Sequence, residues 1–223
     1  MSEIVVQKFG GTSVGTVDRI DSVAEIIKNA SKSNKIVVVV SAMGGETNRL
    51  VDLAKAFGDD PDKREFDALV STGETVSSAL LTMALHSKGV KAKSFSASQI
   101  SMRTTSSYSK AKILDVDAKK ILDVVENDTI PIITGFQGVT EGGDVTTLGR
   151  GGSDTTAVAI AAQISAIRCD IYTDVDGIFT TDPSVVPNAK KLDSITMEEM
   201  LELAGQGAKV VQTRAVELSL IHI

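Results

Sequence analysis

The chain has 223 residues and carries 23 Lys and Arg against 29 Asp and Glu, a formal net charge of −6. This negative balance disfavours nucleic-acid binding, which needs a basic face, and the single Cys169 excludes an internal disulfide framework. A hydrophobic fraction of 42% is ample for a packed core. No apolar run approaches the ~20 residues that span a membrane, and no signal-peptide core precedes the first strand pattern. We therefore expect a cytoplasmic protein that binds neither nucleic acid nor membranes.

Strand patterns and helix patterns alternate along the chain. Short β-branched or apolar runs predict strands at 4–9, 36–40, 91–96, 130–134 and 167–173. Apolar residues at helical spacing predict helices at 16–30, 49–56, 63–88, 115–126 and 153–165. Residues 139–148 carry Glu-Gly-Gly-Asp at their centre, which predicts a hairpin. The alternation predicts one α/β domain with a mainly parallel central sheet, covered by helices on both sides.

Two glycine-rich turns each follow a strand pattern and open a helix pattern. Residues 9–13 read Phe-Gly-Gly-Thr-Ser, and residues 149–154 read Gly-Arg-Gly-Gly-Ser-Asp. Such turns present unpaired backbone N–H groups at the positive end of a helix, where phosphate binds well. One such turn is weak evidence, because glycine also serves steric needs in strand-to-helix connections. Two of them with charges beside them favour an anion site.

Standard nucleotide and hydrolase motifs are not met. Thr16-Val17 stand where a Walker A loop needs Lys-Ser/Thr, and Asp154 stands where a dinucleotide fingerprint needs its third glycine. Lys8 precedes its glycine turn and could reach back over phosphate oxygens, although a lysine there can equally be an ordinary surface residue. His86 lies in a helix pattern and is no convincing base, so a Ser-His-Asp mechanism is disfavoured. These residues suit phosphoryl transfer to a nucleophile that is already anionic.

Lys8-Phe9-Gly10-Gly11-Thr12-Ser13-Val14 resembles the opening signature of aspartate kinases, in the amino-acid kinase superfamily. Further blocks follow in the family's order at 40–43, 47–48, 71–74, 94–97, 135–138, 147–154, 172–177 and 207–210. Several blocks are modest alone, but together they are specific, and the runs before Glu74 and Gln137 are most similar to the monofunctional bacterial branch. The resemblance implies a three-layer α/β/α sandwich, the amino-acid kinase fold.

The resemblance also implies a reaction. ATP would phosphorylate the side-chain carboxylate of L-aspartate to 4-phospho-L-aspartate, the first step of lysine, threonine and methionine biosynthesis. Mg²⁺ would be held by the ATP phosphates and not directly by the protein. Lys8 would neutralise charge on the transferring phosphoryl group, and Asp154 would orient Lys8. Without the family pattern, Asp154 would be interpreted as a helix cap.

The same resemblance assigns binding roles. On the substrate side, Arg150 would grip a carboxylate of L-aspartate, Glu74 would pair with its ammonium group, and Ser41, Thr47 and Ser153 would add hydroxyl contacts. The phosphates would meet Gly10, Gly11, Thr12 and Ser13, and the rest of the nucleotide would meet Thr173, Asp174, Phe179 and Lys209. Phe179 replaces a frequent Tyr, and Ser184 stands where the family often has Arg. Without the resemblance, Glu74 would be interpreted as an ordinary first-turn helix charge.

Two other functions stay open at this point. The first is another kinase of the superfamily, acting on glutamate, N-acetylglutamate, carbamate or UMP; Arg150, Glu74 and the 8–14 run favour aspartate. The second is a non-catalytic, nucleotide-binding regulatory subunit. The presence of four residues argues against it: Lys8, Glu74, Arg150 and Asp154. We expect the full-length protein to be a homo-oligomer.

The end of the chain departs from the family pattern. We expect residues 1–217 to be the catalytic domain without the last strand or strands of its sheet, and we expect the regulatory ACT domains that follow in the family to be absent. Residues 218–223 read Leu-Ser-Leu-Ile-His-Ile, which the transposon adapter CTG-TCT-CTT-ATA-CAC-ATC encodes, although an apolar helix end could coincide with it. We expect a non-native tail on a chain that is less stable and more prone to association than its parent, and inactive.

Overall fold

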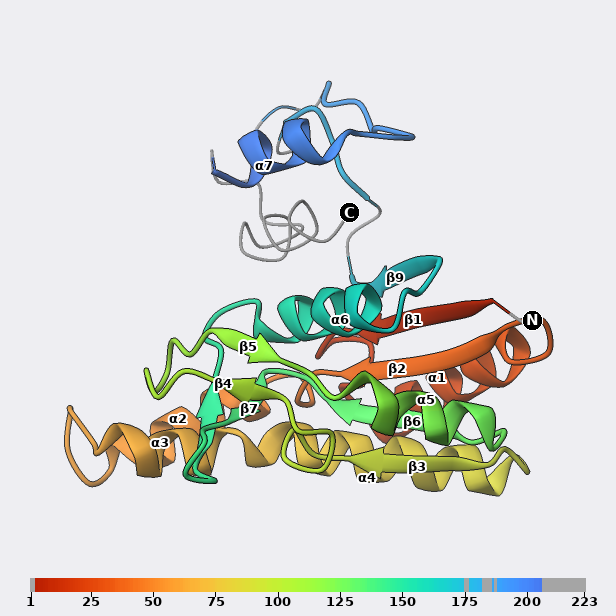
Figure 1. The fold of residues 1–223 in the computed structure, drawn as a ribbon. Coiled ribbons are helices and arrows are strands. Elements are labelled where there is room, and N and C mark those ends of the chain that lie inside the picture. Colours follow the sequence, from red (N-terminus) through yellow and green to blue (C-terminus); the bar gives the residue numbers. More distant parts are fainter. Residues whose placement is uncertain (1–2, 175–176, 182–185, 187, 206–223) are drawn as a thin grey trace.

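The computed structural model describes residues 3–174, 177–181, 186 and 188–205 of the chain (Figure 1). Its strands are β1 Ile4–Phe9, β2 Lys35–Val40, β3 Ala92–Phe95, β4 Arg103–Thr104, β5 Ile113–Asp115, β6 Ile130–Thr134, β7 Gln137–Val139, β8 Val145–Thr147 and β9 Arg168–Tyr172. Its helices are α1 Val17–Ala30, α2 Glu46–Lys55, α3 Lys63–Val70, α4 Thr72–Ser87, α5 Ala118–Glu126, α6 Gly152–Gln163 and α7 Met197–Gly205.

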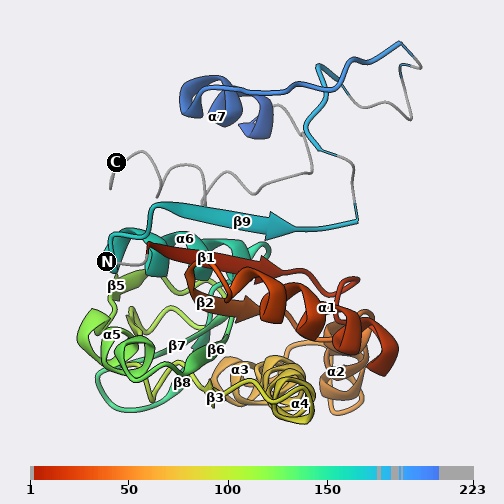
Figure 2. The ribbon, with the colours of Figure 1, turned by 90° about the vertical axis from the view of Figure 1, so that its right-hand side faces the viewer.

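Five parallel strands form the central sheet, in the order β3-β6-β2-β1-β9. The β-branched run Ile36–Val40 occupies the middle strand and is buried on both faces, as expected of a parallel sheet covered by helices. Alternate residues of β1 and β2 face α1 and α4 on one side and α5 and α6 on the other. The predicted α/β class with a mainly parallel central sheet is confirmed, and Figure 2 shows β9, β1 and β2 one after another across it.

A second sheet of four short strands lies beside the carboxyl end of β6, in the order β5-β4-β7-β8. The predicted hairpin is confirmed as β7 and β8, which pair antiparallel with Gln137 opposite Thr147. The sequence patterns did not predict β4 and β5, because two- and three-residue strands are too short to show alternation. The buried hydroxyl groups of Thr104 and Thr146 are hydrogen-bonded to each other within this sheet, and their oxygens are 2.6 Å apart.

The single helix predicted over residues 63–88 is wrong in detail, since the structure has α3 and α4 with Ser71 between them. Ser71 keeps right-handed helical backbone angles, φ −67° and ψ −16°, and its carbonyl accepts a hydrogen bond from the Gln137 side chain at 2.5 Å. By length and composition alone, residues 63–87 could cross a membrane. Half of the most apolar window is buried inside the protein, however, which is how a core helix of a folded domain behaves.

The last part of the chain leaves the central body. After β9 the described residues run to α7, which both views place away from the two sheets (Figures 1 and 2). The patterns did not predict α7. The expected tail at 218–223, and with it the expectation of missing strands, lies outside the described residues.

The face of α4 that packs on the sheet offers a test of the core. Leu85 is fully buried there, whereas Met83 on the opposite face is 62% exposed. We expect Leu85→Ala to lower the free energy of unfolding by about 2–5 kcal/mol, because it leaves a cavity in a close-packed layer. Met83→Ala should change it by less than about 0.5 kcal/mol. Urea denaturation measures both, and equal effects would contradict this packing.

Candidate functional site

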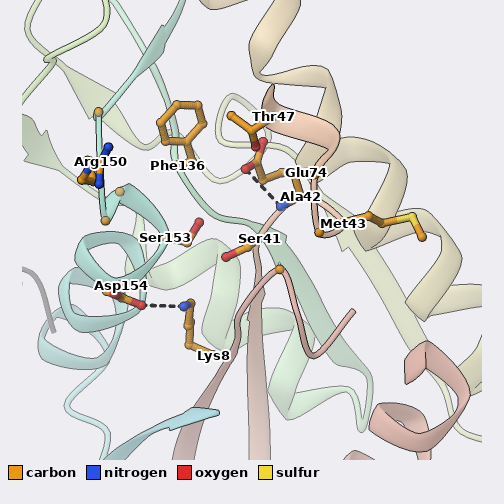
Figure 3. A pocket seen from close by; sticks show the side chains of 16 residues that line it. Lys8, Ser41, Ala42, Met43, Thr47, Glu74, Phe136, Arg150, Ser153 and Asp154 are labelled. Carbon is orange, nitrogen blue, oxygen red and sulfur yellow. Dashed lines mark hydrogen bonds and ion pairs between the residues drawn. The ribbon is translucent and has the colours of Figure 1, made fainter. Parts of the chain in front are cut away.

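A cavity of about 310 Å³ opens at the carboxyl edge of the central sheet. It lies between the ends of β1 and β2, the start of α4 and the glycine turn that opens α6 (Figure 3). Eight of the residues singled out from the sequence line it: Lys8, Gly11, Ser41, Thr47, Glu74, Arg150, Ser153 and Asp154. Segments far apart in the chain therefore meet in one site.

Lys8 and Asp154 form an ion pair at the floor of this cavity. Lys8 lies near the end of β1 on the sheet face that α6 covers, and its Nζ is 2.7 Å from Asp154 Oδ1 (Figure 3). Both residues are only 8% exposed, so water screens the pair weakly. Lys8 is therefore not the ordinary surface lysine that its position could have meant. Nor is Asp154 the N-cap of α6, because Gly151 takes the N-cap position and has no side chain that could accept a capping hydrogen bond.

Glu74 is a buried carboxylate with one unused oxygen. It lies in the first turn of α4, is 3% exposed, and accepts a hydrogen bond from the Ala42 N–H at 3.1 Å. Its Oε2 has no partner in the described part of the chain. Burial raises the pKa of Glu74 to about 7, against an ordinary value of 4.5. A cation entering the cavity would therefore find a desolvated acceptor, which is more than an ordinary first-turn charge offers.

The first glycine turn offers fewer free amides than the sequence predicted. The Gly10 N–H donates to the Tyr172 carbonyl at 3.0 Å and continues the ladder between β1 and β9. This N–H group therefore already has an acceptor, and the expected contact of Gly10 with phosphate stays a prediction. Within the described residues, the N–H groups of Gly11 and Thr12 have no acceptor. Gly11 has to be glycine, because a Cβ there would lie 2.9 Å from the Ala42 carbonyl oxygen.

The second glycine turn, residues 149–152, opens α6 with two left-handed residues. Gly149 has φ +79° and Gly151 has φ +71°, which glycine adopts without strain. Its internal bonds use the N–H groups of Gly152 and Asp154. The N–H groups of Gly151 and Ser153 have no acceptor among the described residues, and they lie at the positive end of the helix.

Arg150 lies on this second turn and is exposed at the cavity. Its side chain makes no hydrogen bond or ion pair within the described residues, unlike the Lys8 ammonium. Phe136 also lines the cavity (Figure 3) and was not singled out from the sequence. It has φ +69°, and its N–H donates to Thr156 Oγ1 at 3.1 Å. The sequence did place Phe136 beside Gly135 in the block at 135–138 that resembles the family, and this position could have indicated it as a site residue.

Three of the residues predicted to meet the rest of the nucleotide, Thr173, Asp174 and Phe179, are described by the structure and do not line this cavity. Thr173 and Asp174 are exposed just after β9, and the Thr173 hydroxyl donates to Asp174 Oδ1 at 3.2 Å. Phe179 forms an isolated bridge with Lys191. Lys209 and Ser184 lie outside the described residues. Thr12 and Ser13, expected at the phosphates, lie beside the cavity and do not line it.

Ligands for a metal ion do not cluster in the described part of the chain. No group of three or more His, Cys, Asp or Glu side chains comes together there. Asp154, a carboxylate that lines the cavity, is already paired with Lys8.

Three comparisons with known proteins bear on this cavity. The sequence model of the amino acid kinase family matches residues 3–219. A curated aspartate kinase of Pseudomonas putida is 55% identical over 217 residues, which are 97% of this chain and 53% of that protein. The chain thus spans about half the length of the curated relatives it matches.

Two solved structures resemble the fold closely. The crystal structure of aspartate kinase from Synechocystis is 48% identical with a TM-score of 0.84, over 96% of this chain and 36% of that one. The structure of E. coli aspartokinase III in complex with aspartate and ADP is 32% identical with a TM-score of 0.91, over 99% of this chain and 60% of that one.

The raised pKa of Glu74 makes stability depend on pH. The folded-state pKa of about 7 exceeds the ordinary 4.5. The contribution of protonated Glu74 to the free energy of unfolding is therefore complete below about pH 4.5 and is lost as the pH rises through 7. Between pH 4.5 and 8, the free energy of unfolding of wild type should fall relative to Glu74→Gln by roughly 3 kcal/mol. Denaturant titrations at the two pH values measure this. Met83→Ala is the control, and parallel behaviour of wild type and Glu74→Gln would contradict the assignment.

Proposed function

This chain belongs to the amino acid kinase family, and from that membership we propose that it transfers the γ-phosphoryl group of ATP to the side-chain carboxylate of L-aspartate. The product is 4-phospho-L-aspartate, the first intermediate on the route to lysine, threonine and methionine. Support comes from relatives that are about 55% identical over 97% of the chain and are named aspartate kinases. A 32% identical neighbour is described as holding aspartate and ADP together.

The arrangement of charges in the cavity carries the proposal. Among the residues that the structure describes, Glu74 offers a buried oxygen without a partner, and Arg150 offers a guanidinium without one. Lys8 adds an ammonium group held in place by Asp154. An amino acid with two carboxylates has the complementary set: its ammonium group would pair with Glu74, one carboxylate with Arg150, and the other would face Lys8.

The reaction needs alignment more than proton transfer. The side-chain carboxylate oxygen of aspartate forms a bond to the γ-phosphorus, the bond from that phosphorus to the β–γ bridging oxygen breaks, and ADP leaves with the electron pair. No proton moves, so the lack of a histidine base in the cavity is no obstacle. The obstacle is repulsion between carboxylate and triphosphate, which Lys8 and the free amides of Gly11 and Ser153 would reduce by a preorganised positive potential.

We propose that Mg²⁺ takes part as a complex with ATP. Because the described residues gather no carboxylate cluster, the ion would be held by phosphate oxygens, where it would neutralise further charge. The chain's own part is to keep Lys8 paired with Asp154, so that the ammonium group stays at the phosphoryl position and is not free to swing away.

The proposal extends to the rest of the protein. We propose that residues 1–217 are a catalytic domain, since the relatives are about twice as long as this chain. We also propose self-association of the full-length protein and a cytoplasmic location; the bacterial relatives support the location. Thr173, Asp174, Phe179 and Lys209 stay proposed nucleotide contacts.

Hydroxylamine trapping tests the substrate directly. An acyl phosphate reacts with hydroxylamine to give a hydroxamate, so ATP and L-aspartate should give a coloured iron complex when the protein is present. L-glutamate, N-acetylglutamate, carbamate and UMP are assayed in parallel by ADP release. Faster turnover of one of these would favour another kinase of the superfamily. Binding of ATP without product from any acceptor would favour a regulatory subunit.

Lys8 offers the sharpest mutational test. We expect Lys8→Ala to lower turnover by roughly 10²–10³-fold, as for the loss of one preorganised donor. The control is Lys91→Ala, an exposed lysine just before β3 at the amino edge of the sheet, which should leave turnover within about twofold. Circular dichroism verifies that both variants fold. Near-normal turnover of a folded Lys8→Ala protein would remove Lys8 from the mechanism.

A further inference from the structure

Asp67 is a fully buried carboxylate that the proposed reaction does not use. It lies in α3, has no exposed surface, and does not line the cavity. Its hydrogen-bond donors are all uncharged, because no Lys, Arg or His side chain is paired with it within the described residues. A buried carboxylate without a cation is costly unless its hydrogen bonds are well made, so this one needs an explanation.

Four hydrogen bonds from two other segments satisfy it. Oδ2 accepts from the Ser109 N–H at 2.8 Å and from the Thr147 N–H at 2.7 Å. Oδ1 accepts from the Ser109 hydroxyl at 3.0 Å and from the Thr147 hydroxyl at 2.9 Å. Asp67 thus clamps one residue of the 105–112 loop and the last residue of β8 to α3, each by a backbone and a side-chain donor.

Both clamped residues border the turn that carries Arg150. Thr147 lies three residues before Arg150, at the point where β8 runs into that turn. The carbonyl oxygen of Ser109 lies against Gly149, so closely that a Cβ on Gly149 would be 3.0 Å from it. Thr147 is also joined to the loop directly, since its carbonyl accepts from the Ala111 N–H at 3.0 Å.

Arg150 depends on its backbone for position. Because its side chain has no partner in the described part of the chain, only the path of residues 147–152 places the guanidinium at the cavity. We propose that Asp67 is a positioning residue for Arg150: by holding Thr147 and Ser109 it fixes the turn from which Arg150 grips the substrate carboxylate. This inference rests on the proposed function, in which Arg150 binds that carboxylate.

Asp67→Ala tests the clamp through substrate affinity. Removal of the carboxylate leaves two buried N–H groups without an acceptor, so the turn should shift. We expect the KM for L-aspartate to rise about 10- to 100-fold, as for a small misplacement of a binding group, while the KM for ATP stays within about twofold. A purely structural role would lower the melting temperature without separating the two KM values.

Two further variants serve as rescue and control. In Asp67→Asn the amide oxygen can accept from both N–H groups, and its NH₂ can donate to the two hydroxyl oxygens; the KM for L-aspartate should return close to wild type. Arg64→Ala removes another contact between α3 and the β7–β8 hairpin, where the Arg64 guanidinium donates to Asp144 at 2.7 Å, and should leave that KM unchanged. Failure of the rescue, or an equal shift in Arg64→Ala, would overturn the proposal.

Two safeguards keep the outcomes separate. If wild type does not phosphorylate L-aspartate, the proposed function fails; if wild type does and Asp67→Ala keeps its KM for L-aspartate, only the role of Asp67 fails. Should Asp67→Ala not fold, Thr147→Val removes a single hydroxyl donor while keeping the backbone bond. A rise of about threefold in the KM for L-aspartate would then support the clamp, and an unchanged KM would overturn it.

Discussion

The approach of two glycine turns at the carboxyl edge of the sheet is the constraint on which the site depends. One turn ends β1 and the other opens α6, and between them the Lys8 ammonium group lies 2.7 Å from Asp154. Away from that partner, a lysine at this depth would carry an uncompensated charge in a region of low dielectric. The pair therefore holds β1 and α6 together and at the same time keeps a cation at the floor of the cavity.

Close backbone approach makes this geometry possible. Besides Gly11, the glycines at 73 and 135 have no room for a side chain, because a Cβ there would lie 2.7 Å from the Cβ of Ala42 or Ser153. Gly73 brings the start of α4 onto the Ala42 segment, which lets the Ala42 N–H reach Glu74. Gly135 brings the end of β6 against Ser153. The first turns of α4 and α6 therefore lie in close contact with the residues that follow β2 and β6, and together these segments form the cavity.

The charged side chains of the site differ in how far their charges are compensated by the protein itself. Glu74 loses solvation and keeps one oxygen unused, and Lys8 has its partner already in place. Arg150 has no side-chain partner among the described residues, and it lies on a turn whose path is held by α3 and the 105–112 loop. A ligand with both an ammonium group and carboxylates has the charges that complement all three side chains.

The sequence by itself determined the central sheet, most of the helices and eight of the residues that line the cavity. The β-branched run at 36–40 could only be a doubly buried strand, and the run of blocks from Lys8 onward named eight residues that do meet in one cavity. Tertiary structure alone decided what these residues do to one another. Nothing local shows that the Gly10 N–H donates to Tyr172, that the Gln137 side chain binds the Ser71 carbonyl between α3 and α4, or that Asp67 binds a residue 42 positions away in the sequence. The reason is physical: hydrogen bonds and desolvation depend on what lies nearby in space, whereas local sequence encodes only periodicity and turn chemistry.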